Sequence, residues 1–349
     1  MSITSMVAEK WSPPAAVKDS FEGQVVLVTG ANTGLGLQAA KKLAALGPDK
    51  LIITTRSQAK GEATKSQIKQ WLDTTKSTQR TEITPMVLDM SSSAGVKTFA
   101  EQLNTGTKKL DAAILNAGIS QPNYRTSAEG FEETIQVNTV STVFLATLLL
   151  PLLTSTAIST NTQPRLTIIS SRTSLMGSAF PTSASVLDST TPLKAMSQQE
   201  NFPAGAVGGQ AQYARSKLML EYAMRRMVQL PITRSAQNTP LVIINSVCPG
   251  VTKTDLARGY EGWFFAVLKR IFFVLFSKSA EAGANSYLQA VIQGEGSMGQ
   301  MWAGGHIVEE WSFLKSEKGR KLGDNVWEEM KVLMRGWDSS IAAILEQKL

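Results

Sequence analysis

The sequence predicts an α/β protein with a doubly wound fold, in which helices cover both faces of a central parallel sheet. Short aliphatic segments typical of strands alternate with longer segments of helical periodicity, from about residue 24 to about residue 247. The aliphatic segments are continuously apolar, which indicates strands buried on both faces. The first of them ends in a glycine-rich turn that leads directly into a helical segment. Right-handed crossovers then place the helices on the two faces of the sheet.

The same patterns give the order of the elements. Strands are expected at 24–28, 51–55, 83–88, 111–115, 165–169 and 241–247, and helices at 35–46, 58–72, 91–103, 137–152 and 212–230. The first strand reads QVVLV, and the break Gly47-Pro48-Asp49 suits the exit of the first helix. Alternating strands and helices of this kind predict a Rossmann-type sheet.

Domain organisation is expected to be simple, because no repeat and no Pro- or Ser-rich linker divides the chain. We expect an N-terminal arm over 1–21 and a single Rossmann-type domain over 22–349 that ends in a C-terminal helical extension. Two less regular stretches lie at about 178–209, rich in Ser, Thr, Gly, Ala and Pro, and at about 253–278, rich in Phe. We interpret both as insertions near a site.

Composition excludes several functions. The formal net charge is +7, but Lys and Arg are scattered, so nucleic-acid binding is not expected. The one cysteine, Cys248, cannot close an internal disulfide, which fits a reducing compartment. The one histidine, His306, cannot build a His-rich metal site, so no metal is expected. No G-x-S-x-G motif accompanies it to suggest a serine hydrolase.

No membrane-spanning segment is expected. The N-terminal residues lack the apolar core of a secretory signal, and the longest apolar runs, 143–153 and 262–276, are shorter than the roughly 18–20 residues that cross a bilayer. A cytoplasmic location is therefore expected. The run at 262–276 contains Lys269 and Arg270, so peripheral contact with a membrane is the alternative to a role in binding a lipophilic substrate.

The turn after the first strand reads Thr29-Gly30-Ala31-Asn32-Thr33-Gly34-Leu35-Gly36. Glycines let the backbone approach a pyrophosphate closely, and the free amides and dipole at the following helix N-terminus favour its negative charge. The spacing is G-x-x-x-G-x-G, and a tight turn without a ligand is the alternative interpretation. The pattern favours a dinucleotide-binding site.

Further short motifs follow this turn in a fixed order. They are Asp89 after the third strand, Asn116-Ala117-Gly118 after the fourth, Asn138 in the next helix, Tyr213-Ala214-Arg215-Ser216-Lys217, and Pro249-Gly250 after the sixth strand. Together with the glycine turn they resemble the signature of the short-chain dehydrogenase/reductase family, over roughly 23–327. The resemblance implies a nicotinamide cofactor bound by Thr29, Gly30, Asn32, Thr33, Gly34, Leu35, Gly36, Arg56, Asp89, Asn116, Ala117, Gly118, Tyr213, Lys217, Pro249, Gly250, Val251, Thr252 and Thr254.

The Y-x-x-x-K spacing of Tyr213 and Lys217 has its own physical logic. Positions i and i+4 share one helical face, so the ammonium can lie close to the phenol and pull the phenol pKa down from its usual value near 10. Tyr213 could then give a proton to a carbonyl oxygen or take one from an alcohol. The alternative is a half-buried tyrosine beside a solvated lysine.

The resemblance also assigns a serine and an asparagine to the catalytic centre. Ser171 is the expected partner of the reacting oxygen, but it precedes Tyr213 by 42 positions, more than is common in the family, which leaves Ser170 and Ser174 as alternatives. Asn138 is implied to support the lysine through a water, and its alternative role is a helix cap. Asp89 is implied to contact adenine and could also cap the next helix.

Cofactor preference rests on the end of the second strand. An acidic residue there would bind the ribose 2′-hydroxyl of NAD(H), whereas this chain has the neutral Thr55 followed by Arg56, which can pair with a 2′-phosphate. NADP(H) is therefore expected in preference to NAD(H).

These expectations add up to an NADP(H)-dependent oxidoreductase that interconverts a ketone and a secondary alcohol on a bulky lipophilic molecule. The chain looks most like retinol- and steroid-dehydrogenase relatives and fungal natural-product tailoring reductases, and the insertions favour secondary-metabolite biosynthesis. The alternatives are an enzyme of this fold with a non-redox outcome (isomerase, dehydratase or cyclase), a retinol- or steroid-type dehydrogenase at a membrane surface, and a cofactor-sensing protein without catalysis. The family commonly forms homodimers through helix pairing, although an extended C-terminus can block that surface.

Overall fold

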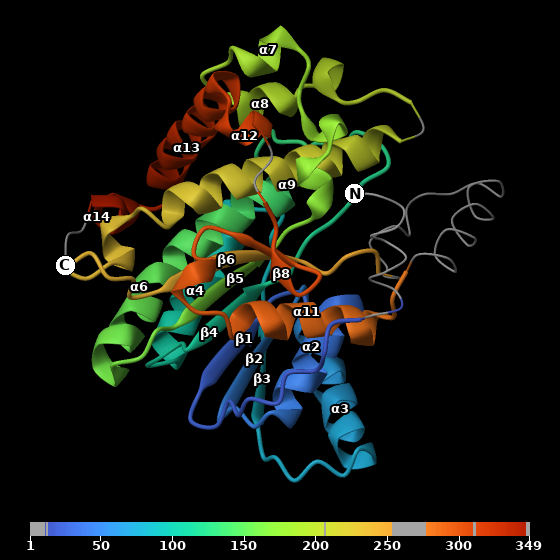
Figure 1. Ribbon diagram of the computed structural model, residues 1–349, viewed down its shortest axis with the longest axis vertical. Helices are drawn as coiled ribbons and strands as arrows, with labels where there is room; N and C mark the ends of the chain where they lie inside the picture. The colour runs from blue at the N-terminus through green and yellow to red at the C-terminus, as the bar shows by residue number, and fades with distance from the viewer. Residues whose placement is uncertain (1–10, 12, 206, 253–276, 310–311, 347–349) are drawn as a thin grey trace.

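The computed structural model describes residues 11, 13–205, 207–252, 277–309 and 312–346, and its centre is an eight-stranded sheet in the order β3-β2-β1-β4-β5-β6-β7-β8 (Figure 1). The strands are β1 (Val25–Val28), β2 (Lys50–Thr55), β3 (Glu82–Val87), β4 (Ala112–Leu115), β5 (Arg165–Ile169), β6 (Ile243–Cys248), β7 (Met301–Ala303) and β8 (His306–Ile307). All neighbouring strands pair in parallel except β7 and β8, which are antiparallel. The strand order reverses between β1 and β4, which opens a crevice at their carboxyl ends.

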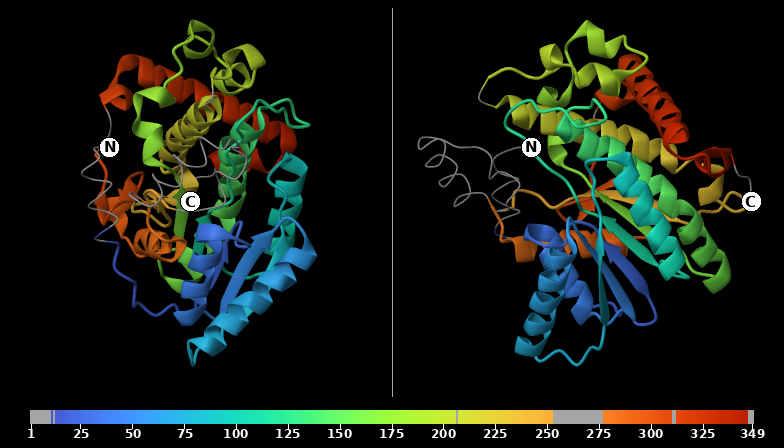
Figure 2. Two further views of the ribbon diagram at one scale, coloured as in Figure 1. Left: turned by 90° about the vertical axis from the view of Figure 1, so that its right-hand side faces the viewer. Right: turned by 180° about the vertical axis from the view of Figure 1, so that it is seen from behind.

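Helices cover both faces of the sheet, as Figures 1 and 2 show. One face carries α2 (Gly34–Ala45), α3 (Gln58–Thr74) and α11 (Ala280–Val291); the other carries α4 (Ser93–Gly106), the continuous helix α5–η1–α6 (Glu133–Ile135, Gln136–Ser141 and Thr142–Thr160) and α9 (Gly208–Met227). Two separate clusters of buried apolar side chains fill these layers. The predicted doubly wound fold, with a mostly parallel sheet between helices, is confirmed.

The remaining elements are short turns of helix and the C-terminal extension. They are η2 (Arg172–Leu175), η3 (Gly177–Ala179), α7 (Ala184–Leu187), α8 (Pro192–Met196), η4 (Gln199–Asn201), η5 (Pro231–Thr233), η7 (Glu295–Ser297), α12 (Ser312–Lys315), α13 (Glu317–Trp337) and α14 (Ile341–Glu346). The first insertion thus contains α7, α8 and η4. The second insertion is described only at Ser277 and Lys278, and its other residues from 253 onward lie outside the described ranges.

The structure departs from the sequence-based expectation in several places. Helix α11 was not predicted, and α9 spans Gly208–Met227 rather than 212–230. Strands β7 and β8 were not predicted, because segments of three and two residues are too short to show a period and depend on the pairing of β7 with β6 and of β8 with β7. The helix that carries Asn138 begins at Glu133 and ends at Thr160, so it is longer at both ends than the predicted 137–152. The first turn of this helix is polar, so hydrophobic periodicity does not show where the helix begins.

This long helix, Glu133–Thr160, has the length and composition of a membrane span, and is the one such helix among the described residues. Its most apolar window is 83% buried in the fold, where it packs between the sheet, α4 and α9. The helix is therefore apolar because it lies in the core, where other elements cover most of its surface.

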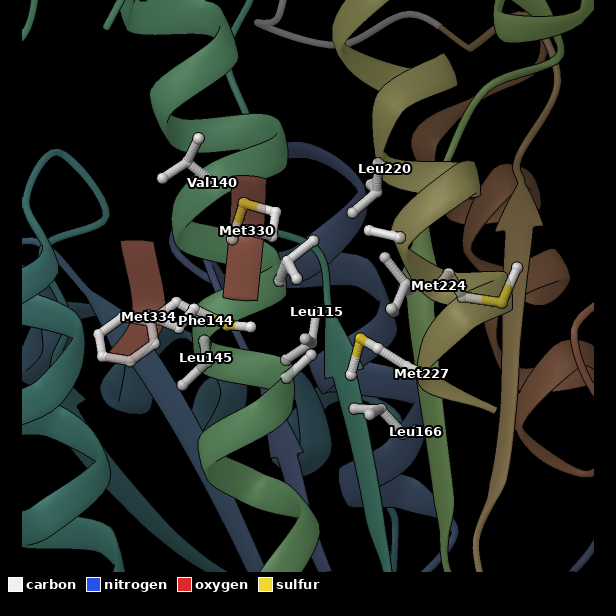
Figure 3. Close-up of a cluster of buried hydrophobic side chains, with 14 of the residues drawn as sticks. Leu115, Val140, Phe144, Leu145, Leu166, Leu220, Met224, Met227, Met330 and Met334 are labelled. Atoms are coloured by element: carbon white, nitrogen blue, oxygen red, sulfur yellow. The ribbon is translucent and has the colours of Figure 1, made fainter. Parts of the chain in front are cut away.

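Helix α13 adds a further layer over α6 and α9 (Figure 3). The buried side chains of Met330 and Met334 extend the core formed by Val140 and Phe144 of the long helix, and the Trp337 ring lies 5.3 Å from that of Phe144 between centroids. The C-terminal extension is therefore part of the main hydrophobic core.

Removing a core side chain of α13 should destabilise the whole domain. Met330→Ala is expected to lower the free energy of unfolding by about 2–5 kcal/mol, because it leaves a cavity in the core. Val332→Ala, at a position 72% exposed on the same helix, should change it by less than about 0.5 kcal/mol. Urea unfolding of both variants measures the difference, and equal effects would show that α13 is not integrated into the core.

Candidate active site

The glycine turn after β1 is held in a compact shape by hydrogen bonds from the neighbouring strands. The Gly30 amide donates to Thr54 Oγ1 (3.1 Å), and Asn116 Nδ2 donates to the carbonyls of Thr29 (2.9 Å) and Gly30 (3.1 Å). A Cβ at Gly36 would lie 2.4 Å from Asn116 Nδ2 and 2.5 Å from the Gly30 carbonyl oxygen. Glycine at position 36 is thus required by the close approach of the Asn116 side chain.

The N-terminus of α2 faces this turn with its first amides available. Its N-cap residue, Thr33, makes no side-chain cap hydrogen bond with any residue that the structure describes, whereas Ser57 and Ser92 cap α3 and α4 in the usual way. An uncapped helix N-terminus beside a glycine turn offers backbone donors and the positive end of the helix dipole to an anion. The residues present therefore fit the pyrophosphate of a dinucleotide.

The segment after β4 connects this turn to the rest of the site. The Ala117 amide donates to Thr29 Oγ1 (3.0 Å). A Cβ at Gly118 would lie 3.1 Å from Asn138 Oδ1 and 3.8 Å from Lys217 Nζ. The Asn-Ala-Gly motif therefore brings the glycine turn, Asn138 and Lys217 into one place.

Asn138 lies fully buried within the π-helical segment η1 rather than at a helix end, so its alternative role as a cap is wrong. Its Oδ1 accepts a hydrogen bond from the Ile119 amide (2.9 Å), and its Nδ2 donates to the Ile119 carbonyl (2.8 Å) and to Ser216 Oγ (3.0 Å). One side chain thus joins β4, the long helix and α9. Local π-helical turns of this kind are frequent at functional sites.

Tyr213, Lys217 and Ser171 converge beside this junction. The Tyr213 phenol lies close enough to the Ser171 hydroxyl for that hydroxyl to lower the phenol pKa. Lys217, almost fully buried, donates from Nζ to the Ile169 carbonyl (2.7 Å), and Nζ lies 5.8 Å from the centre of the Tyr213 ring. Residues from β5, η2 and α9 therefore meet at the carboxyl end of β5.

The electrostatics of this trio differ in part from the sequence-based expectation. Burial raises the pKa of Tyr213, the Cys248 thiol raises it further, and the Ser171 hydroxyl lowers it. Burial lowers the pKa of Lys217 to about 8, against an opposing effect of Glu221 and Cys248. The expected lowering of the phenol pKa by Lys217 is therefore wrong, because the exclusion of water raises this pKa and Lys217 is not among the groups that shift it.

Among the three candidate serines, Ser171 is the one whose hydroxyl affects the pKa of Tyr213. The hydroxyl of Ser170 is buried without a hydrogen-bond partner in the described part of the chain. Ser174 Oγ donates to the Ser171 carbonyl (2.6 Å), and Ser171 Oγ accepts from Thr173 Oγ1 (2.9 Å). The geometry thus favours Ser171, while Ser174 holds the loop that presents it.

Two residues expected at the adenosine end of the cofactor lie exposed at the carboxyl ends of β2 and β3. Arg56 follows β2 and has no ion-pair partner among the described residues. The Asp89 carboxylate accepts from the Ser91 amide (2.9 Å) and hydroxyl (2.7 Å). The cap of α4 is Ser92, so the expectation that Asp89 also caps that helix is wrong.

The segment after β6 approaches the glycine turn through α11. Gly250 has φ of 75°, a conformation that suits glycine, and the Val251 carbonyl accepts from the Lys278 amide (2.9 Å). Thr252 lies against α11, where a Cβ at Gly283 would be 2.8 Å from Thr252 Oγ1. The predicted contact Thr254 lies outside the described residues, as does the Phe-rich run at 262–276.

Two residues at this site were not anticipated from the sequence. Cys248, at the end of β6, is close enough for its thiol to affect the pKa of Tyr213 and of Lys217. Tyr287 of α11 is buried and donates from its hydroxyl to Asn116 Oδ1 (2.9 Å), and burial raises its pKa. No local motif marks either residue, because each reaches the site through tertiary packing.

The sequence is similar to those of known proteins over most of its length. Residues 24–183 match the family model described as short chain dehydrogenase. The short-chain dehydrogenase/reductase phmF of Phaeosphaeria nodorum is 35% identical over 94% of this chain and 92% of its own length. The chain belongs to the short-chain dehydrogenase/reductase family. A second relative, the short-chain dehydrogenase/reductase ffsI of Aspergillus flavipes, is 32% identical over 94% of this chain and 91% of its own length.

Solved structures show the same fold at low sequence identity. The Pseudomonas aeruginosa RhlG/NADP active-site complex superposes with a TM-score of 0.58 at 20% identity, over 81% of this chain and 95% of that one. A variant of actinorhodin polyketide ketoreductase with NADPH gives a TM-score of 0.55 at 16% identity, over 83% and 97% of the two chains. Family and fold together make this protein an oxidoreductase of the short-chain type.

The buried ammonium of Lys217 should leave a signature in the pH dependence of stability. Its pKa is about 8 in the folded protein and 10.5 ordinarily, so burial opposes folding fully below pH 8, and this opposition fades between pH 8 and 10.5. Lys217→Met should therefore be more stable relative to the wild type at pH 7 than at pH 10. Thermal unfolding across this range measures the difference, with Lys69→Met at an exposed position of α3 as the control. A difference for Lys217→Met that does not vary with pH would contradict this assignment.

Proposed function

We propose that this protein is an NADP(H)-dependent reductase, or the reverse dehydrogenase, that interconverts a ketone and a secondary alcohol on a bulky lipophilic molecule. The observation that carries the proposal is the convergence of the Tyr213 phenol and the Ser171 hydroxyl beside the buried Lys217, next to the uncapped N-terminus of α2. This places proton-donating groups next to a site that fits a dinucleotide. The family assignment supports the same chemistry.

A nicotinamide held by these residues would supply the hydride that the carbonyl carbon accepts. The Tyr213 phenol gives its proton to the carbonyl oxygen, so that an alcohol forms and a phenolate is left on the protein. The Ser171 hydroxyl orients the same oxygen by hydrogen bonding. The Lys217 ammonium stabilises the transient phenolate electrostatically, an effect that is strong because the site is buried. By family resemblance Asn138 supports Lys217 through a water.

The expected cofactor residues are supported by their positions. Glycines 30, 34 and 36 and the α2 amides would hold the pyrophosphate, Asp89 the adenine, and Thr252 the nicotinamide amide. Arg56 is exposed at the end of β2 without a described ion-pair partner and would pair with a 2′-phosphate. This supports NADP(H) rather than NAD(H).

A lipophilic substrate is supported by apolar side chains exposed beside the site. Met176 follows η2, and Val207 precedes α9; their side chains are 45% and 55% exposed. The insertion with α7 and α8 lies between Ser171 and Tyr213 in the sequence and packs against α9 and α13. An insertion of this size between Ser171 and Tyr213 fits a tailoring enzyme of secondary-metabolite biosynthesis better than an enzyme with a small housekeeping substrate.

Loss of the Tyr213 hydroxyl should abolish turnover. Tyr213→Phe is expected to lower kcat for NADPH-dependent reduction of a bulky aryl ketone by at least about a hundredfold, because the proton donor is lost. NADPH binding, followed by fluorescence, should persist. Tyr222→Phe on the same helix removes a buried hydroxyl without a described partner and should keep activity. Full activity in Tyr213→Phe would refute the assigned role.

Arg56 should set the preference between the two nicotinamide cofactors. Arg56→Ala is expected to raise KM for NADPH about tenfold or more, because a charge-assisted contact is worth about 1.5–3 kcal/mol. KM for NADH should hardly change. Arg80→Ala, at an exposed position before β3, serves as the charge-matched control. An unchanged ratio of the two KM values in Arg56→Ala would argue against 2′-phosphate recognition by this residue.

A further inference from the structure

A buried carboxylate of the C-terminal helix completes the N-terminus of α8 in the first insertion. Glu329 of α13 accepts hydrogen bonds from the amides of Leu193 (2.7 Å, at Oε2) and Lys194 (3.0 Å, at Oε1). Its side chain is nearly inaccessible to water. Thr191, the N-cap residue of α8, makes no side-chain cap hydrogen bond to a described residue. Glu329, which lies on α13, thus acts as the N-terminal cap of α8.

The other end of α8 contacts the residue next to Tyr213. The Gln212 side-chain amide donates to the Met196 carbonyl (3.3 Å) and to Glu132 Oε2 (3.1 Å). Gln212, Met196 and Glu132 are all fully buried. A continuous buried path therefore leads from α13 through α8 to the first turns of α9.

The N-terminus of α9 depends on contacts with other elements, because its own residues stabilise it little. The helix begins with Gly208 and Gly209, which gain more conformational entropy on unfolding than other residues, and Val207 provides no side-chain cap among the described residues. The position of Tyr213 in the second turn is therefore set by tertiary contacts. The buried amide of Gln212 is such a contact, and it points away from the reacting atoms toward α8.

Gln212 also connects α9 to the helix of Asn138. Its second acceptor, Glu132, is the N-cap of that helix and accepts from the amides of Thr134 (3.0 Å) and Ile135 (3.2 Å). Burial raises the pKa of Glu132, while its hydrogen bonds lower it. The single amide of Gln212 thus joins the starts of the two helices that carry Tyr213 and Asn138.

We propose that Glu329 and Gln212 are positioning residues, through which the C-terminal helix fixes the insertion against α9 and thereby sets the place of the Tyr213 phenol. Neither residue is assigned contact with substrate or cofactor. Misplacing a reacting group by about 1 Å can reduce turnover a hundredfold. A less firmly held α8 should therefore displace the Tyr213 phenol and lower turnover. The effect on turnover rests on the proposed function; the mechanical linkage does not.

Hydrogen exchange of the full-length protein tests the linkage without any assay of activity. In Glu329→Gln, amide exchange should accelerate about tenfold or more in α8 and also in the first turns of α9 and in the segment 132–138. The control is Glu328→Gln, an exposed neighbour that pairs with Lys331 on the same helix. Acceleration confined to α8, or none, would overturn the proposal. Gln212→Met, with Gln210→Met as its exposed control, interrupts the path from the other end and should loosen the same segments.

Turnover provides the second readout, with NADPH and a bulky aryl ketone as the probe. Glu329→Gln and Gln212→Met should each lower kcat about tenfold or more, with KM for NADPH unchanged and with the protein folded at the assay temperature. The double variant should lose little more than the worse single variant, because both act through α8. Additive losses, or losses that merely follow the folded fraction, would contradict the positioning role. A wild type that does not reduce the ketone would count against the proposed function, while the exchange result would still decide the linkage.

Discussion

The site depends on one buried side chain, the carboxamide of Asn138. Its three hydrogen bonds hold the backbone at Ile119, on the segment that follows β4, and the hydroxyl of Ser216, in the turn between Tyr213 and Lys217. A buried amide that is left unpaired is destabilising by about 1–3 kcal/mol, so each of these bonds contributes to holding the three segments together. The dinucleotide half of the fold and the helix of Tyr213 are thereby fixed relative to each other.

A second constraint comes from the C-terminus. Helices α13 and α14 pack on α6 and α9, and the side chains of Met330 and Met334 join the main core. The same extension reaches the insertion through Glu329 and, in addition, through Asn325, whose side-chain amide donates to the Ser189 carbonyl (2.8 Å). Helix α13 thus contributes both to the hydrophobic core and to the position of the first insertion.

The doubly wound fold could be predicted because aliphatic strands and amphipathic helices have different periods, and these periods are visible in the sequence. The residues Asn116, Asn138, Tyr213 and Lys217 could be found because each belongs to a short motif, and these motifs follow one another in the order that resembles the family signature. The strand β7 could not, because it exists only through pairing with β6. Similarly, Cys248, Tyr287 and Glu329 reach their partners across long stretches of chain, and no local pattern marks such contacts. The pKa of Tyr213 was expected in the wrong direction, because the spacing indicates a nearby ammonium but not the burial that raises this pKa.

We propose that the trio of Tyr213, Ser171 and Lys217 supports hydride transfer to a carbonyl. The most direct measurement is transfer of deuterium from NADPH labelled at C4 of the nicotinamide to a bulky aryl ketone, followed by mass spectrometry of the product. The expected product is an alcohol with one deuterium on the carbinol carbon when the label is on one face of the nicotinamide, and with none when the label is on the other face. Product that forms without deuterium from either label and without consumption of NADPH would contradict this proposal.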